Sequence, residues 1–128
     1  MSETIHVAVA VIQIGDRILI AKRPVHLHKG GYWEFPGGKV ESDETIQQAL
    51  IRECYEELAI VPCLFRPLIE IRHQYPEKEV LLDVWLVTDY LGVPAGVEGQ
   101  PLVWCTLQNL KGYQFPEANI PIIEKLTS

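Results

Sequence analysis

The chain lacks the features that mark membrane proteins, secreted proteins and proteins that hold long nucleic acids. None of its apolar runs approaches the roughly 20 residues that a membrane-spanning helix requires. Residues 1–4 do not open a basic segment followed by an apolar one, so we expect no secretion signal. Eleven Lys and Arg stand against seventeen Asp and Glu, and the net charge of −6 disfavours a surface that binds long nucleic acids.

Cysteine is also scarce. Cys54, Cys63 and Cys105 are odd in number, widely spaced and without a Cys-x-x-Cys pair, which argues against a disulfide framework and against a zinc site. The simplest location is therefore a reducing cytoplasm. No repeat, low-complexity tract or linker interrupts the 128 residues, so we expect one domain over residues 1–128.

Strand-like segments fill much of the chain. β-branched residues dominate 5–14, and a Gly-Asp turn signal separates this segment from 17–21, which predicts a hairpin. Segments 67–75 and 79–89 predict a second hairpin. The Gly- and Pro-rich stretch 92–101 predicts a long loop, and a long loop inside a small domain often has a function.

Two segments have helical character. Residues 44–58 contain no Gly or Pro and carry a stripe of apolar side chains at helical spacing, with Ser42 or Asp43 as the candidate N-cap. The stripe consists of Leu50, Ile51, Cys54 and Leu58. A shorter helix is expected over 120–126, with Asn119 as its N-cap. Strands followed by a helix, twice, predict an α/β fold in which a mixed sheet lies between helices.

A stripe of acid lies beside the apolar stripe of the first helix. Glu53, Glu56 and Glu57 are spaced by one, three and four residues, so their side chains lie within an arc of about 100°. Like charges at these spacings destabilise a helix, and Arg52 can neutralise only one of the three carboxylates. A divalent cation such as Mg²⁺, which prefers carboxylate oxygens, is the natural remaining counter-charge. The alternative, which charge runs alone favour, is a solvated helix face.

Gly37 and Gly38 precede this helix. A glycine pair lets the backbone approach other groups closely, so that a carbonyl could ligate the metal or an amide could face a phosphate.

These residues resemble the Nudix box, the signature of the Nudix hydrolase family. The box has a glycine, a glutamate, an Arg-Glu pair, a Glu-Glu pair and a final Gly-apolar pair at fixed spacings. This chain fills those positions with Gly38, Glu44, Arg52, Glu53, Glu56, Glu57 and Ile60, and with Cys54 at an apolar position. Ala59 stands where the family has its last glycine, a residue preferred in a left-handed helix cap.

The resemblance extends over nearly the whole chain and is strongest to the MutT-type members of the family. It rests further on the segments 33–39, 98–101 and 115–119. It implies a Nudix-type α/β/α sandwich that hydrolyses a nucleoside triphosphate to the monophosphate and pyrophosphate with Mg²⁺ or Mn²⁺. The implied substrate is 8-oxo-dGTP or a related oxidised guanine nucleotide, whose removal protects DNA replication. We expect a monomer with this small molecule as its partner, and no membrane or long nucleic acid.

The resemblance also implies roles for the acidic residues. Glu53, Glu56, Glu57 and Glu98, with the carbonyl of Gly37, would bind the metal. One glutamate would help to deprotonate the attacking water; Glu53 is our choice and Glu98 is its rival. The remaining two box residues would support these groups, with Glu44 as an orienting acid and Arg52 holding the glutamates in place.

Five further residues match positions that contact the nucleotide in MutT-type proteins: Arg23, His28, Phe35, Gly38 and Asn119. The guanidinium of Arg23 suits phosphate oxygens, although a surface ion pair is an equal alternative. The amide of Asn119 offers a donor and an acceptor to a purine edge, but an Asn at this position is also a good helix cap. The alternative for Phe35 is plain core packing, and the alternative for His28 is an ordinary loop residue without a role in binding.

Three other functions compete with this one. Within the family, the substrate could be a pyrimidine nucleotide such as CTP or a modified dCTP, because the box says little about the base. Outside catalysis, the chain could be a Nudix-like module that binds a nucleotide without cleaving it. The third alternative is an acidic domain whose glutamates serve only solubility.

Overall fold

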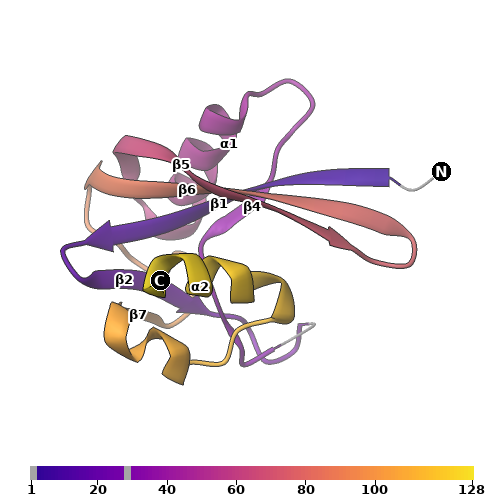
Figure 1. The fold of residues 1–128 in the computed structure, drawn as a ribbon. Helices are drawn as coiled ribbons and strands as arrows, with labels where there is room; N and C mark the ends of the chain where they lie inside the picture. Colours follow the sequence, from indigo (N-terminus) through magenta and orange to yellow (C-terminus); the bar gives the residue numbers. More distant parts are fainter. Residues whose placement is uncertain (1–2, 28–29) are drawn as a thin grey trace.

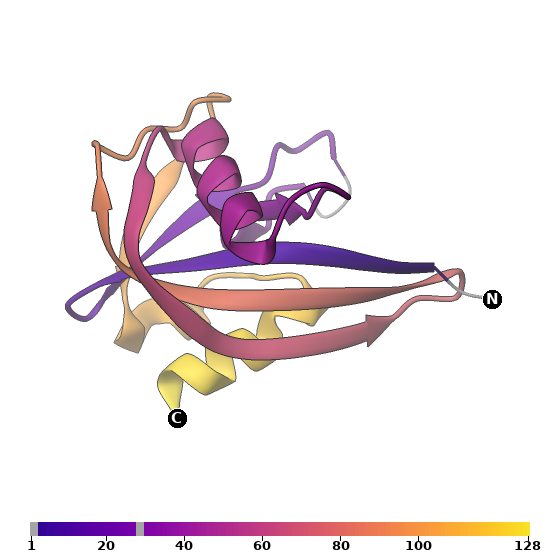
Figure 2. The same ribbon diagram turned by 90° about the horizontal axis from the view of Figure 1, so that it is seen from above.

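A mixed β-sheet with one helix on each face forms the computed structural model, which describes residues 3–27 and 30–128. Figures 1 and 2 show α1 and α2 on opposite sides of the strands. Along the chain, the elements are β1 (Glu3–Ile14), β2 (Arg17–Lys22), β3 (Trp33–Glu34), β4 (Gly37–Lys39), α1 (Ile46–Leu58), β5 (Val61–Gln74), β6 (Lys78–Leu91), β7 (Leu102–Thr106), the 3-10 segments η1 (Leu107–Gly112) and η2 (Glu117–Asn119), and α2 (Ile120–Thr127).

Strand β1 is the centre of the sheet. It pairs with β6 in parallel over ten residues, from Glu3 opposite Lys78 to Ile12 opposite Val87. Its other edge is shared between two antiparallel partners, because β4 pairs with its middle and β2 with its end. Strand β7 continues beyond β2, and β5 forms the far edge beside β6. The predicted mixed sheet between helices is therefore confirmed.

Alternate residues of β1 feed two separate cores. Ala8, Ala10 and Ile12 pack with the buried face of α1, whereas Val9 and Val11 pack with α2 and the 3-10 segments. This is the two-residue period of a strand that is buried on both faces. The sheet thus holds α1, with its acidic residues, in a fixed position relative to the C-terminal segments.

The predicted hairpins are confirmed, but the second one is longer than its sequence suggests. Strand β5 begins at Val61 rather than at residue 67 and contains Pro62 and Pro67. Proline has no N–H to donate, and it is tolerated here because β5 lies at the edge of the sheet. The short strands β3 and β4, and also β7, were not predicted.

The start of α1 differs from the prediction. Thr45, not Ser42 or Asp43, is the N-cap: its hydroxyl accepts from the Gln48 N–H at 3.2 Å, and its own N–H donates to the Gln48 side chain at 2.8 Å. This reciprocal pair is a capping box. The helix therefore begins at Ile46, and Glu44 lies in the loop before it.

The rest of α1 follows the expected pattern with one exchange. Leu50, Cys54 and Leu58 are fully buried, but Ile51 is only half-buried and Ala49 takes the remaining core position. The helix ends at Ala59 in the left-handed conformation, with φ 60° and ψ 30°. The cap for which the family uses glycine is thus formed here by alanine.

Helix α2 begins at Ile120 as expected, with Asn119 in the N-cap position. The Asn119 side chain makes no capping hydrogen bond to the helix, so the capping role considered from the sequence is wrong. In the part of the chain that the structure describes, no helix is long and apolar enough to cross a membrane.

Candidate functional site

The acidic stripe of α1 faces a cavity of about 510 Å³. Glu53, Glu56 and Glu57 line it from the helix, and Glu98 lines it from the loop after β6. The remaining lining residues are Arg23, Glu34 and Gly37. Five carboxylates from three separate segments therefore meet at one hollow, and the alternative of a merely solvated helix face does not describe them.

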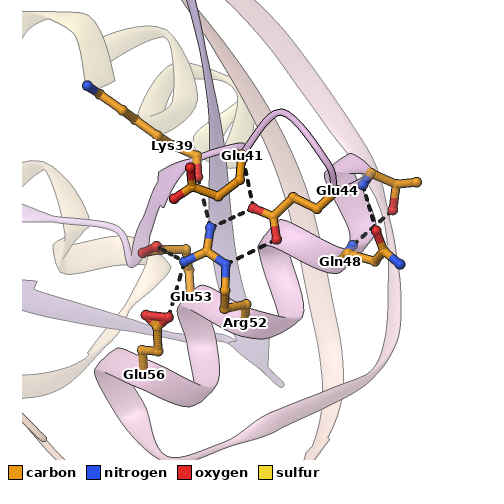
Figure 3. A network of polar contacts seen from close by, with 8 residues as sticks. Lys39, Glu41, Glu44, Gln48, Arg52, Glu53 and Glu56 are labelled. Atoms are coloured by element: carbon orange, nitrogen blue, oxygen red, sulfur yellow. Dashed lines mark hydrogen bonds and ion pairs between the residues drawn. The ribbon is translucent and has the colours of Figure 1, made fainter.

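Arg52 organises the acidic residues (Figure 3). Its Nη1 donates to Glu53 at 2.7 Å and to Glu56 at 3.2 Å. Its Nη2 donates to the Lys39 carbonyl at 3.0 Å, which ties the helix to the end of β4. The Arg52 guanidinium thus sets the orientation of the Glu53 and Glu56 carboxylates relative to β4.

Glu44 is held on the other side of the same guanidinium. Arg52 donates to its two oxygens from Nη2 at 2.6 Å and from Nε at 3.1 Å, and the Glu41 N–H donates to it at 2.9 Å. The hydrogen bond from Arg52 is the main reason why the pKa of Glu44 lies below its usual value. Glu44 does not line the acidic cavity in the described structure, so it contacts this site through Arg52.

The two glycines of β4 bring the backbone against these groups. A Cβ at Gly38 would overlap the Glu53 carboxylate, and one at Gly37 would overlap the Ala8 carbonyl. The N–H of Gly37 donates to Glu57 at 3.3 Å. Gly37 requires glycine because the Ala8 carbonyl occupies the space of a side chain, whereas a side chain at position 38 would displace the Glu53 carboxylate.

Glu57 is the most perturbed carboxyl of the site. Its pKa is raised to about 9, first by burial, then by a hydrogen bond with Glu53 and by the negative charges of Glu53 and Glu34. The Gly37 N–H opposes this shift only in part. At neutral pH, Glu57 therefore holds a proton, which is the expected response of crowded acids without a nearby cation.

The donor set of this cavity fits a divalent metal ion. Carboxylate oxygens are the ligands that Mg²⁺ and Mn²⁺ prefer, and a bound cation would replace the proton that Glu57 holds. Within residues 3–27 and 30–128, no three His, Cys, Asp or Glu side chains already form a metal-binding group. Glu53 and Glu56 line this cavity, and each also accepts a hydrogen bond from Arg52 at one carboxylate oxygen, Oε1.

The predicted loop 92–101 is confirmed, and it is attached to the end of α1. Ala95 N–H donates to the Leu58 carbonyl at 2.9 Å, and Val97 N–H donates to the Glu57 carbonyl at 3.2 Å. Gln100 adds a side-chain bond to the same Glu57 carbonyl at 3.0 Å and accepts from the Glu98 N–H at 2.9 Å. The loop thus satisfies helix-end carbonyls and fixes the backbone of Glu98 near the stripe.

A second cavity, of about 450 Å³, adjoins the first and lies on the face of β1 that points away from α1. Its walls are more apolar and include Val7, Val9 and Leu82. Polar and charged side chains also line it, among them Lys39, His73, Tyr75, Glu117 and Asn119. Phe35 lines this cavity while being only 5% exposed, and it stacks on Phe115 with ring centroids 5.1 Å apart. Phe35 therefore packs in the core and also lines this cavity.

The predicted nucleotide-contacting residues gather at these cavities. Arg23 lines both, whereas Phe35, Gly38 and Asn119 line the second. His28 lies outside the described residues.

Several polar residues at or beside the cavities were not assigned a role from the sequence. Glu34 lines both cavities, His73 lines the second, and Gln100 ties the loop to α1. Glu34 and Gln100 occur inside segments that carry the family resemblance, which is the signal that could have found them. His73 is brought to the cavity by the long β5–β6 hairpin, and nothing in its local sequence indicates this placement.

Comparisons with known proteins agree with this geometry. A family model described as a NUDIX domain matches residues 7–125. The 8-oxo-dGTP diphosphatase of Escherichia coli K12 is 39% identical over 123 residues, which cover 95% of each chain. The CTP pyrophosphohydrolase of the same strain is 38% identical over 120 residues, which cover 94% of this chain and 89% of that protein.

A solved structure has the same fold. The MutT structure from work on Aliivibrio salmonicida and Vibrio cholerae matches with a TM-score of 0.87 and 37% identity over 98% of both chains. The sheet flanked by helices is therefore the Nudix α/β/α sandwich. The match over most of the chain and the residues that meet at the acidic cavity lead to one assignment: this chain belongs to the Nudix hydrolase family.

Proposed function

We propose that this protein is a metal-dependent nucleoside triphosphate pyrophosphohydrolase that converts 8-oxo-dGTP to 8-oxo-dGMP and pyrophosphate. One observation carries the proposal: an acidic cavity suited to cations adjoins a more apolar cavity that Asn119 helps to line. The first would take the phosphate chain and the second the base. The 8-oxo-dGTP diphosphatase of Escherichia coli, at 39% identity, supports the choice of substrate.

The metal would be held by Glu53, Glu56, Glu57 and Glu98, with the Gly37 carbonyl as a further oxygen ligand. When bound, Mg²⁺ or Mn²⁺ neutralises phosphate oxygens and makes a water molecule more acidic. Glu53 would accept the proton of the attacking water, and Glu98 is the alternative acceptor. Their proximity to the same cavity supports both assignments.

The other site residues would bind and orient the substrate. Arg23 would contact phosphate oxygens, and the Gly38 backbone would allow the phosphate chain to lie close. Phe35 would form an apolar wall for the base, and Asn119 would pair its amide with the base edge. We assign His28 to the nucleotide pocket from the family resemblance alone.

Arg52 and Glu44 would act on the reaction through other residues. Arg52 contacts Glu53 and Glu56 directly, and Glu44 accepts two bonds from Arg52. Both would therefore keep the metal-binding carboxylates oriented.

A nucleotide panel with pyrophosphate detection tests this function. Purified protein should release pyrophosphate from 8-oxo-dGTP in Mg²⁺, with a higher kcat/KM than from dGTP, and should stop when EDTA is added. If no nucleotide in the panel is cleaved in Mg²⁺ or Mn²⁺ although one binds, the chain is a binding module and the proposal is wrong.

CTP or a modified dCTP is the second candidate substrate. The specific observation in its favour is the near-equal similarity to the CTP pyrophosphohydrolase of Escherichia coli, 38% against 39%. The same panel separates the two candidates, because a CTP enzyme should prefer CTP over 8-oxo-dGTP in kcat/KM.

We propose further that the protein acts in the cytoplasm as a monomer. Its three cysteines are free thiols, two of them buried, which suits a reducing compartment. Size-exclusion chromatography with light scattering tests the monomer, which predicts a mass near 14.5 kDa.

A further inference from the structure

Arg23 and Glu34 form an ion pair in the wall between the two cavities. Arg23 Nη1 donates to Glu34 Oε1 at 2.9 Å, and only these two residues and Gly37 line both cavities in the described structure. The pair therefore lies where the two halves of a bound nucleotide would join.

The backbone places both residues with little freedom. Strands β2 and β3 pair Ala21 with Glu34, and Arg23 follows two residues later. The Arg23 N–H donates to the Tyr32 carbonyl at 2.8 Å, and the Arg23 carbonyl accepts from the Gly31 N–H at 3.1 Å. Both Cα positions are thus fixed by backbone hydrogen bonds, and the Glu34 carboxylate is one of the groups that define the direction of the long Arg23 side chain.

The electrostatic surroundings of Glu34 disfavour its charged form, so its presence at this position calls for a functional explanation. Burial raises its pKa, as does the negative charge of Glu98, while Arg23 lowers it. Glu34 in turn contributes to the raised pKa of Glu57. A carboxylate at this position also repels the polyphosphate of an incoming substrate. A need for solubility therefore does not explain why Glu34 lies here.

We infer that Glu34 is a positioning residue that directs the Arg23 guanidinium toward the phosphate chain of the substrate. This inference rests on the proposed function. A guanidinium has five N–H donors in a planar fork, so the bond to Glu34 restricts its orientation and leaves other donors for phosphate. Restricting the side chain in advance reduces the entropy lost when phosphate binds.

A double-mutant cycle tests the coupling of the two side chains. Arg23→Ala should lower kcat/KM roughly 10- to 100-fold, and Glu34→Ala roughly 5- to 20-fold, mostly through a higher KM. In the Arg23→Ala background, Glu34→Ala should change kcat/KM by less than about twofold, because there is no guanidinium left to position. Glu34→Gln, which keeps an oxygen acceptor, should recover part of the loss.

Three outcomes would overturn the inference. Equal losses from Glu34→Ala with and without Arg23 would mean a general structural role. A lower KM in Glu34→Ala would mean that the carboxylate only repels the substrate. A loss that tracks a fall in melting temperature, and that Glu34→Gln does not reduce, would mean that folding alone is affected.

Arg72 and Glu79 supply the matched control. They form an ion pair of the same length, 2.9 Å, between β5 and β6 and outside both cavities. Glu79→Ala should leave kcat/KM within about twofold of wild type.

A binding measurement separates this inference from the proposed function. Inorganic tripolyphosphate in Mg²⁺ is titrated by calorimetry into the four members of the cycle: wild type, the two single variants and the double variant. If wild type cleaves no nucleotide, the proposed function is wrong, and coupling in tripolyphosphate affinity still supports the Arg23–Glu34 inference. Additive losses of affinity contradict the inference even in an active enzyme, and the absence of both binding and cleavage contradicts both.

Discussion

Arg52 grips Glu44 with two hydrogen bonds, of 2.6 and 3.1 Å, while its Nη1 holds Glu53 and Glu56. The loop before α1 and the acidic face of α1 are therefore joined through one guanidinium (Figure 3). A lysine side chain is not able to make all of these contacts at once, because they use several N–H donors of the planar arginine guanidinium.

Arg52→Lys is expected to reduce kcat/KM roughly 10- to 100-fold, as is typical when a residue that orients metal ligands is altered. Lysine keeps the charge but releases either Glu44 or the stripe carboxylates. Steady-state hydrolysis measured over a range of Mg²⁺ concentrations should show a higher metal requirement. Arg72→Lys on β5 is the control, and equal activity of the two variants would contradict the orienting role.

Glu53→Gln and Glu57→Gln are each expected to abolish most pyrophosphate release, with losses beyond the roughly 100-fold upper range of residues that only support metal ligands. Glu53→Gln removes a negative charge from the cavity, and Glu57→Gln removes a carboxyl group that can release its proton to bind a metal ion, while both changes preserve side-chain shape. Circular dichroism should show an intact fold in both. Full activity in either variant would refute the assigned metal site.

Glu57→Gln should also change how stability depends on pH in EDTA. The Glu57 carboxyl has a pKa of about 9 in the folded protein, against 4.5 for an ordinary glutamate. Between these values the folded state holds a proton that the unfolded chain has released, so rising pH favours unfolding. The stability contribution is complete below about pH 4.5 and is lost progressively as pH approaches 9.

We therefore expect the melting temperature of wild type to fall more steeply from pH 5 to pH 9 than that of Glu57→Gln. At pH 8 the variant should melt higher than wild type by at least roughly 3–5 °C, the shift that about 1 kcal/mol produces in a domain of this size. Glu124→Gln, an exposed change on α2, should leave the wild-type pH profile unaltered. Parallel profiles for wild type and Glu57→Gln would show that Glu57 does not hold the proton.

Ala59→Gly is expected to stabilise the protein by about 0.5–1 kcal/mol. A left-handed conformation strains residues with a Cβ by about 1–2 kcal/mol, and the greater flexibility of glycine when unfolded offsets part of the gain. Urea unfolding measures the difference. Ala49→Gly within α1, where the backbone is right-handed, should instead destabilise by at least about 1 kcal/mol, and a loss of stability in Ala59→Gly would contradict this account.

The sequence predicts the parts of this molecule whose signals are local. The hairpins, the loop 92–101 and the helix predicted over 44–58, whose observed start is Ile46, follow from periodicity and turn residues. The start of β5 does not, because Pro62 and Pro67 argue against a strand unless its place at the sheet edge is known. Strands β3 and β4 have two and three residues, too few for a periodic signal.

The candidate site divides in the same way. The spacing of Glu53, Glu56 and Glu57 places them on one helix face, and the family resemblance adds Glu98 from a distant loop. The contact of Arg23 with Glu34 depends on the pairing of β2 with β3, and His73 reaches the second cavity only through the length of β5. Neither relationship is visible without the tertiary structure.

Asn119→Ala should separate recognition of the base from stability. The Asn119 side chain makes no capping bond to α2 and lines the second cavity, so its loss should change the free energy of unfolding by less than about 0.5 kcal/mol. If the amide pairs with the oxidised base, KM for 8-oxo-dGTP should rise roughly 10- to 100-fold, and KM for dGTP much less.

Kinetics with the two nucleotides and urea unfolding of the same variant make the comparison. Thr45→Ala is the matched control for capping, because Thr45 does accept a bond from the helix N-terminus and its loss should lower stability by about 1 kcal/mol without changing the ratio of the two KM values. Equal increases of KM for both nucleotides would remove Asn119 from base selection, and a loss of stability as large as that of Thr45→Ala would restore the capping role.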